Sequence, residues 1–217
     1  MTTTILSLNV GMPKIIGHWR GAPVLSGFDK QPVEGPTVFV SALGIHGDGQ
    51  ADLESHGGFD KAVYAYPARN WPWWESEKHF ACRPGVFGEN LTLDDLDETS
   101  VFIGDRFVWG DVVLEVAQPR APCFKLAVYT GRDDLPSAMA LSGRCGWYYR
   151  VVREGMAPIT GALTRVVRAE APSIRETFLA VFDKTSNREV LQRIKETPCL
   201  SEAWQHQVDR RLASVNR

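Results

Sequence analysis

Short runs that alternate apolar with polar residues make up most of the first three quarters of the chain, and Gly, Pro and Asp separate them. The runs are rich in β-branched and aromatic residues, which is typical of strands. In the run at 112–117, the apolar residues at the even positions share one face and Glu115 lies on the other. The sequence therefore predicts strands at 1–10, 37–43, 62–66, 112–117, 146–152 and 162–167.

A hairpin and one helix complete the prediction for this part of the chain. Residues 101–103 and 106–109 are expected to pair through a turn at Gly104-Asp105, and a second glycine–aspartate turn leads into the next strand. The segment 70–79 is expected to be a helix. Many short strands without regular strand–helix alternation favour a barrel or a sandwich.

From Ser173 onward the apolar residues recur with the period of amphipathic helices. Ser173 and Glu176 have the spacing of a capping box, and Asn187 and Ser201 are in position to cap a second and a third helix. Three helices this short cannot bury all of their apolar faces alone. We therefore expect a mainly β domain with some α at 1–168, and a small three-helix bundle at 169–217 that packs on it or on another subunit.

Composition and charge narrow the class of protein. A net charge of −2 over 217 residues argues against a general nucleic-acid footprint, so no nucleic acid is expected as a partner. Four scattered cysteines without a C-x-x-C pair are typical of a reducing cytoplasm. The first residues lack a basic, apolar leader, and no apolar run is long enough to span a bilayer. We expect a cytoplasmic, soluble protein with no membrane partner.

Cys123 is the residue with the most chemical information. It follows a predicted strand, two prolines flank Arg120 just before it, and Lys125 comes just after it. The prolines favour a stiff, extended segment, and nearby positive charge favours the thiolate, which attacks electrophiles and ligates soft metals. A free cysteine is also often a small buried hydrophobe. Taken alone, the segment leaves both interpretations open.

Glycine-rich loops hold further candidates, because sites are commonly mounted on loops of a rigid scaffold. His56 precedes two glycines, which allow a ligand to approach the backbone closely, and Asp60 and Lys61 follow. His56 is a candidate proton relay that Asp60 would orient. The alternative is a capped turn with a solvated surface pair.

Two polar residues in other loops complete the set of candidates. Asn90, in a turn at 87–90, offers an amide to a heterocycle or holds its own backbone. Arg144 is a candidate phosphate ligand or one partner of a surface salt bridge. A zinc site built from His46, Asp48, His56 and Cys82 would match no established ligand spacing, and the sequence contains no nucleophile elbow, Walker loop or dinucleotide fingerprint.

Taken together, these motifs resemble the MOSC domain family, and within it the bacterial YiiM group, over nearly the whole chain. The resemblance is carried by SGFDKQPVEGP (26–36), GDGQADLESHGGFDKAVYAYP (47–67), PGVFGENLT (84–92), the cysteine-containing segment 103–126 and GWYYRVVREG (146–155). The three-helix tail is also similar to the one in that group. The resemblance implies a MOSC-type β-barrel followed by a small C-terminal helical bundle.

The same resemblance implies a site for the molybdenum cofactor (molybdopterin). In such proteins the cysteine ligates molybdenum, which here would be Cys123, with His56 and Asp60 in the network beside the metal. Asn90 would meet the pterin edge. The basic residues that would hold the phosphate and the pterin are Lys30, Lys61, Arg120, Lys125 and Arg144.

The activity implied is a molybdenum-dependent oxidoreductase that reduces N-hydroxylated compounds, such as hydroxylaminopurines, hydroxylamines or amidoximes. The chain carries no flavin or haem signature, so a separate electron-donating reductase is expected, together with a homodimeric state. Two alternatives belong to other classes. One is a carrier of the cofactor, or of sulfur as a Cys123 persulfide, and the other is a pocket for a phosphorylated small molecule without redox chemistry.

Overall fold

Seven strands close into a barrel in the computed structural model, which describes residues 1–51, 57–183 and 185–215. The order around the barrel is β13-β9-β10-β11-β7-β8-β1, and pairing between β13 and β1 closes the ring. Neighbours are antiparallel except β7 and β8, which are parallel. The bounds are β1 Thr2–Val10, β7 Val63–Pro67, β8 Leu91–Leu93, β9 Arg106–Trp109, β10 Val112–Pro119, β11 Trp147–Arg153 and β13 Gly161–Val167. The predicted fold class is confirmed.

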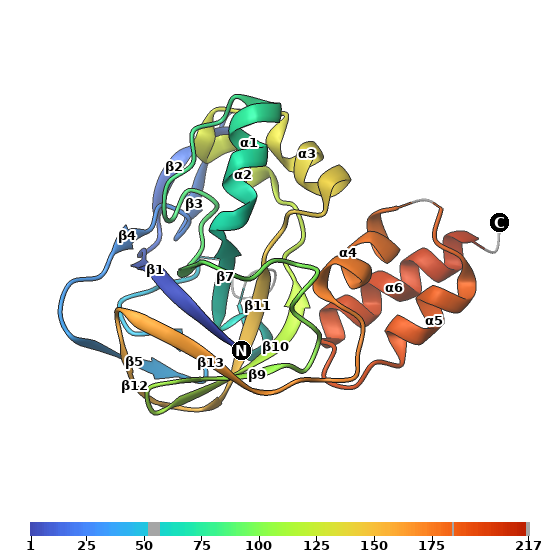
Figure 1. The fold of residues 1–217 in the computed structure, drawn as a ribbon. Coiled ribbons are helices and arrows are strands. Elements are labelled where there is room, and N and C mark those ends of the chain that lie inside the picture. The colour runs from blue at the N-terminus through green and yellow to red at the C-terminus, as the bar shows by residue number, and fades with distance from the viewer. Residues whose placement is uncertain (52–56, 184, 216–217) are drawn as a thin grey trace.

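Smaller sheets and helices surround the barrel (Figure 1). The strand β4 (Gln31–Pro32) pairs with the end of β1, and β2 (Lys14–Trp19) forms a hairpin with β3 (Ala22–Ser26). A three-stranded sheet contains β5 (Thr37–Ser41), β6 (Gly44–Ile45) and β12 (Gly155–Pro158). The helices on this part of the chain are η1 (Phe59–Lys61), η2 (Ala68–Asn70), α1 (Trp71–Lys78), α2 (Phe124–Thr130) and α3 (Leu135–Ser142).

The expected hairpin at 101–109 is wrong in its first half. Residues 101–103 do not pair with β9, because β9 pairs with β10 on one side and β13 on the other. Phe102 instead makes an isolated bridge to Ser173. Asp105 then folds the chain back, since its carboxylate accepts a hydrogen bond from the Phe102 amide at 3.2 Å.

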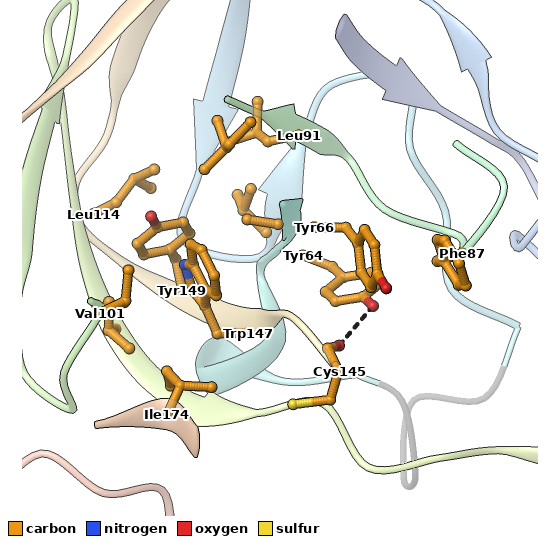
Figure 2. Close-up of a cluster of buried hydrophobic side chains, with 14 of the residues drawn as sticks. Tyr64, Tyr66, Phe87, Leu91, Val101, Leu114, Cys145, Trp147, Tyr149 and Ile174 are labelled. Atoms are coloured by element: carbon orange, nitrogen blue, oxygen red, sulfur yellow. Dashed lines mark hydrogen bonds between the residues drawn. The ribbon is translucent and has the colours of Figure 1, made fainter. Parts of the chain in front are cut away.

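Large aromatic side chains fill the interior of the barrel. Trp109, Trp147, Tyr149 and Phe107 are all fully buried, and the rings of Phe107 and Tyr149 meet edge to face with centroids 5.7 Å apart. Figure 2 shows part of this core, with Tyr149 and Trp147 facing apolar residues of neighbouring strands. Burial of side chains this large supplies most of the hydrophobic stabilisation of a domain of this size.

The three C-terminal helices pack against one side of the barrel (Figure 1). They are α4 (Ile174–Phe182), α5 (Arg188–Lys195) and α6 (Glu202–Val215). The capping box at Ser173 and Glu176 and the cap at Asn187 are present as predicted. Ser201 precedes α6, where its hydroxyl accepts a hydrogen bond from the Trp204 amide at 3.3 Å.

Backbone hydrogen bonds join the bundle to the barrel at two places. The Ile174 amide donates to the Val101 carbonyl at 2.8 Å, and the Ser201 amide donates to the Ala117 carbonyl of β10 at 3.1 Å. Glu115, predicted on the face of β10 opposite the apolar residues, is buried and pairs with Arg106 and Arg150. No helix in the described parts of the chain is both long enough and apolar enough to cross a bilayer.

Candidate functional site

Cys123 lies in the short connection between β10 and α2. Its backbone is extended, with φ −135° and ψ 143°, as the prolines around Arg120 predicted. The helix α2 begins at the next residue, and the Leu126 amide donates a hydrogen bond to the Cys123 carbonyl at 3.0 Å. The residue is half-buried, so its thiol is neither sealed in the core nor fully in solvent.

The cysteine lines a pocket of about 80 Å³ in which several predicted residues meet. Six of the predicted residues are among its walls: Lys30, Lys61, Asn90, Arg120, Cys123 and Lys125. Four of these are cationic, and Asp48 is the single carboxylate among the described residues that line the pocket. The pocket therefore carries an excess of positive charge and is suited to an anion.

Arg120 is buried at the back of this pocket, with an exposed fraction of 5%. Its guanidinium lies over the rings of Tyr64 and Phe28, 5.5 and 5.7 Å from their centroids. Such aromatic surroundings stabilise a cation. Its charge also interacts with the thiol of Cys123. Arg120 thus brings a fixed positive charge to the cysteine.

Lys30 is held in a buried ion pair with Asp48. Burial lowers the pKa of Lys30, and Asp48 opposes that effect. The Asp48 carboxylate also accepts hydrogen bonds from the Gly11 amide at 2.8 Å and from the Asn90 side chain at 2.9 Å. Asp48 balances the charge of Lys30, and Arg120, Lys61 and Lys125 are the other cationic residues in the walls of the pocket.

Asn90 lines the pocket but its amide is engaged by the protein. Its oxygen accepts a hydrogen bond from the Tyr64 amide at 3.0 Å, and its nitrogen donates to the Asn9 carbonyl at 3.1 Å as well as to Asp48. Both donors are used, so one acceptor lone pair is left for a ligand. Asn90 therefore fixes the position of Asp48 and joins three segments of the wall.

Close packing of loop backbones shapes the same wall. A Cβ added to Gly27 would lie 2.1 Å from the Gly49 carbonyl oxygen and 2.7 Å from that of Gly11. Only glycine fits at this position. The contact places the loop that carries Lys30 against the loop that carries Asp48.

Two further predicted residues, Asp60 and Arg144, are not among the described walls of this pocket. Asp60 forms an ion pair with Arg150 of β11 at 2.7 Å, although the next residue, Lys61, is part of the wall. Arg144 lies over the ring of Trp73, 4.7 Å from its centroid, so its expected contact with the cofactor lacks support from the geometry. His56 lies outside the described residues.

Sequence reasoning missed several residues of the site. Tyr148 lines the pocket beside Arg120 and Cys123. Burial raises the pKa of its hydroxyl, and the charge of Arg120 partly offsets that rise.

The alternative of a zinc site finds no support in the described parts of the chain. Of its candidate ligands, Cys82 has a pKa that burial raises to about 12, which disfavours the thiolate that zinc requires. Among the described residues, no three His, Cys, Asp or Glu side chains converge on one point.

A second hollow, of about 190 Å³, adjoins the cationic pocket. The two share Lys61, Arg120, Cys123 and Tyr148 as walls. The far side of the second hollow is formed by α6, through Ala203, Trp204 and Gln207. Cys123 thus lies between two spaces, one bordered by barrel loops and the other by the C-terminal bundle.

The fold and the pocket together define a β-barrel protein that presents a half-buried thiol among cationic side chains. The chain belongs to the MOSC domain family, which matches residues 52–171. A Bacillus subtilis protein, "Uncharacterized protein YflK", is 37% identical over 93% of this chain and 90% of its own. The Escherichia coli "Protein YiiM" is 31% identical over the same shares.

Solved structures extend this similarity to the whole fold. The crystal structure of YiiM from Geobacillus stearothermophilus has a TM-score of 0.80 and 34% identity, over 97% of this chain and 99% of the other. A further relative, from Gibberella moniliformis, is named "Reductase" and is 39% identical over 62% of this chain, although the match covers only 24% of that protein.

Proposed function

We propose that this protein binds the molybdenum cofactor and reduces N-hydroxylated compounds to amines, with Cys123 as the molybdenum ligand. The observation that carries the proposal is the meeting of one half-buried thiol and four cationic side chains in the walls of a single pocket. Thiolates are suitable ligands for a soft metal, and the phosphate of molybdopterin requires positive charge. Membership of the MOSC family and the relative named "Reductase" support the same assignment.

The residues of the pocket fit the cofactor in chemical terms. Arg120 and Lys125 lie on either side of the cysteine in the sequence, line the same pocket and are both buried. They would hold the anionic phosphate, with Lys61 at the junction of the two hollows. Gly27 and Gly49, which also line the pocket, pack their loops against each other and so fix the position of this wall.

When bound, the cofactor would supply the two electrons that cleave the N–O bond. The reaction is R–NH–OH + 2 e⁻ + 2 H⁺ → R–NH₂ + H₂O, so the site needs a source of electrons and a route for two protons. We propose a separate reductase as the electron donor and His56 as the proton relay. Asp60 would act indirectly, because its ion pair with Arg150 fixes the segment that carries Lys61. A homodimer is proposed as the functional state.

Metal analysis beside a turnover assay tests the proposal. Protein expressed with molybdate in a host that makes the cofactor should contain molybdenum, and the Cys123→Ser variant should contain little. With a chemical reductant, the wild type should convert benzamidoxime to benzamidine, and Cys123→Ala should not. The matched control is Cys199→Ser, which removes an exposed thiol outside both hollows and should change neither result.

Other outcomes would overturn the proposal in distinct ways. Molybdenum without turnover of any N-hydroxylated compound would indicate a carrier of the cofactor. Cyanide-labile sulfur on Cys123 without molybdenum would indicate a sulfur carrier. Equal molybdenum content in wild type and Cys123→Ser would remove the cysteine from the ligand set.

A further inference from the structure

The hollow beside α6 differs in chemistry from the cationic pocket on the other side of Cys123. Among the described residues, the charged ones that line it are Lys61 and Arg120, and both are shared with the cationic pocket. The described residues that belong to it alone are uncharged: Gln118, Ala121, Pro122, Ala203, Trp204 and Gln207. A neutral molecule can therefore occupy this side of the thiol without displacing an ion pair.

The helical wall of this hollow is firmly attached to the barrel. The Ser201 hydroxyl donates a hydrogen bond to the Gln118 side chain at 2.7 Å, and the Ser201 amide donates to Ala117 at 3.1 Å. Trp204 is only 1% exposed and packs beside Phe178, with ring centroids 6.2 Å apart. Since the first turn of α6 is fixed at both ends, Ala203 and Gln207 keep a defined position opposite Cys123.

We propose that this hollow receives the substrate, and that Ala203 and Gln207 of the C-terminal bundle determine which substrates reach the thiol side of the site. The inference rests on the proposed function, because it assigns the cationic pocket to the cofactor. It adds a role for the appended helices: the barrel supplies the chemistry, and α6 sets the size and polarity of what is reduced.

The volume of the hollow is sufficient for a substrate with one ring. A cavity of about 150 Å³ is large enough to hold benzene, so 190 Å³ admits one aromatic ring with a small polar substituent. Ala203 has the smallest side chain of the three α6 residues that line the hollow. A larger residue there would fill space that the ring requires.

Gln207 supplies the polarity. Its side chain is half-buried, and among the described residues no hydrogen bond to its amide is present. A carboxamide offers one donor and one acceptor side by side. This pair matches the N–C–N edge of an amidoxime or of an aminated heterocycle, as glutamine matches the edge of adenine in nucleic acids. Gln207 would therefore recognise the atoms next to the N–O bond.

Substrates of two sizes test the role of Ala203. In Ala203→Trp, kcat/KM for benzamidoxime should fall at least about tenfold, which is the scale of steric discrimination in a pocket, while kcat/KM for hydroxylamine should change little. Ala213→Trp is the matched control, because it places the same side chain on an exposed site of α6 outside the hollow. In Gln207→Leu, kcat/KM for benzamidoxime should again fall about tenfold, and kcat/KM for hydroxylamine should not fall.

Alkylation of Cys123 provides a second measurement that needs neither cofactor nor turnover. In cofactor-free protein, the reaction of Cys123 with N-benzylmaleimide, followed by peptide mass spectrometry, should slow at least about tenfold in Ala203→Trp. The rate with iodoacetamide, which is much smaller, should stay within about twofold of the wild type. Both rates should be unchanged in Ala213→Trp.

The two experiments separate failure of this inference from failure of the proposed function. If no N-hydroxylated compound is reduced by the wild type, the function is wrong, and the alkylation rates still show whether α6 controls access to the thiol. If turnover is present but Ala203→Trp affects benzamidoxime and hydroxylamine equally, or lowers molybdenum content, the inference is overturned. In that case the hollow holds part of the cofactor.

Discussion

At the scale of single residues, Glu89 has the most perturbed carboxyl group near the site. Burial raises its pKa from 4.5 to about 7, although hydrogen bonds from Thr92 and from the Gly85 and Phe87 amides favour the carboxylate. The folded protein therefore holds a proton that the unfolded chain releases. The contribution of this residue to stability is complete below about pH 4.5 and is lost as the pH rises to about 7.

Comparison with Glu89→Gln, which cannot ionise, isolates this effect. The free energy of unfolding of the wild type minus that of the variant should fall by about 3 kcal/mol across this pH interval, at about 1.4 kcal/mol per unit of pKa. Urea unfolding at a series of pH values measures it. A difference that is flat with pH would mean an ordinary pKa, and one that rises with pH would mean that the hydrogen bonds outweigh burial.

The cations around Cys123 should bind simple anions even without the cofactor. Inorganic phosphate should raise the melting temperature in a saturable manner, by about 2–4 °C for each kcal/mol of binding free energy. This rise in melting temperature should be lost in Arg120→Met and in Lys125→Met. It should persist in Arg132→Met, whose guanidinium pairs with Asp134 on the surface. A linear rise shared by all four proteins would indicate a bulk salt effect instead.

The sequence predicted the charged residues of the pocket but not the residues with which they form ion pairs or ring contacts. Cys123 and its basic neighbours stand out because proline, cysteine and cations cluster in one segment. The Lys30–Asp48 ion pair joins residues 18 positions apart, in loops whose contact depends on Gly27 and Gly49. The contact of Arg144 with Trp73 could not be predicted for the same reason, because only the tertiary structure brings that ring to its guanidinium.

At the scale of elements, a network around Arg150 joins three parts of the fold. Its guanidinium donates to Asp60 of η1 at 2.7 Å, to the buried Glu115 of β10 at 2.9 Å, and to the Cys199 carbonyl ahead of α6 at 2.9 Å. Arg106 of β9 also pairs with Glu115, at 2.6 Å. The network therefore ties the barrel both to the segment of Lys61 and to the bundle.

Removal of Arg150 should cost more stability than removal of a surface arginine. In Arg150→Met, Glu115 keeps its ion pair with Arg106, and Asp60 loses its ion pair with Arg150. We expect the free energy of unfolding to fall by about 2 kcal/mol, which is below the cost of breaking a fully buried pair. Arg132→Met should cost less than about 0.5 kcal/mol, because its ion pair is exposed. Chemical denaturation at low and high salt measures both. Equal losses would show that the network contributes no more than a surface pair.

The elements that could be predicted are those with strong local signals. The caps at Ser173 and Asn187 and the apolar period behind them fixed α4 and α5. By contrast, α2 and α3 were missed, although Gly131 and Gly143 end them in the left-handed conformation. In α2, β-branched and aromatic residues obscure the helical period. The prediction of a strand at 101–103 was wrong for a different reason, because the strand-like pattern there reflects burial against the bundle.

At the scale of the whole molecule, the bundle and the barrel should unfold together. Ile174, at the start of α4, is fully buried beside Val101, as Figure 2 shows, and backbone hydrogen bonds join the two parts ahead of α4 and ahead of α6. We expect a single urea transition, with far-UV circular dichroism and tryptophan fluorescence giving the same midpoint and the same m-value. Two separate midpoints would instead show that the predicted units at 1–168 and 169–217 unfold independently.

Closure of the ring by β1 and β13 has a consequence for synthesis on the ribosome. The register places Thr2 opposite Thr164, so one edge of β1 stays uncovered until the segment around Thr164 has been made. During translation that edge is a template for pairing with other nascent chains. Until β13 is made and pairs with β1, a newly made molecule therefore carries an edge that favours aggregation.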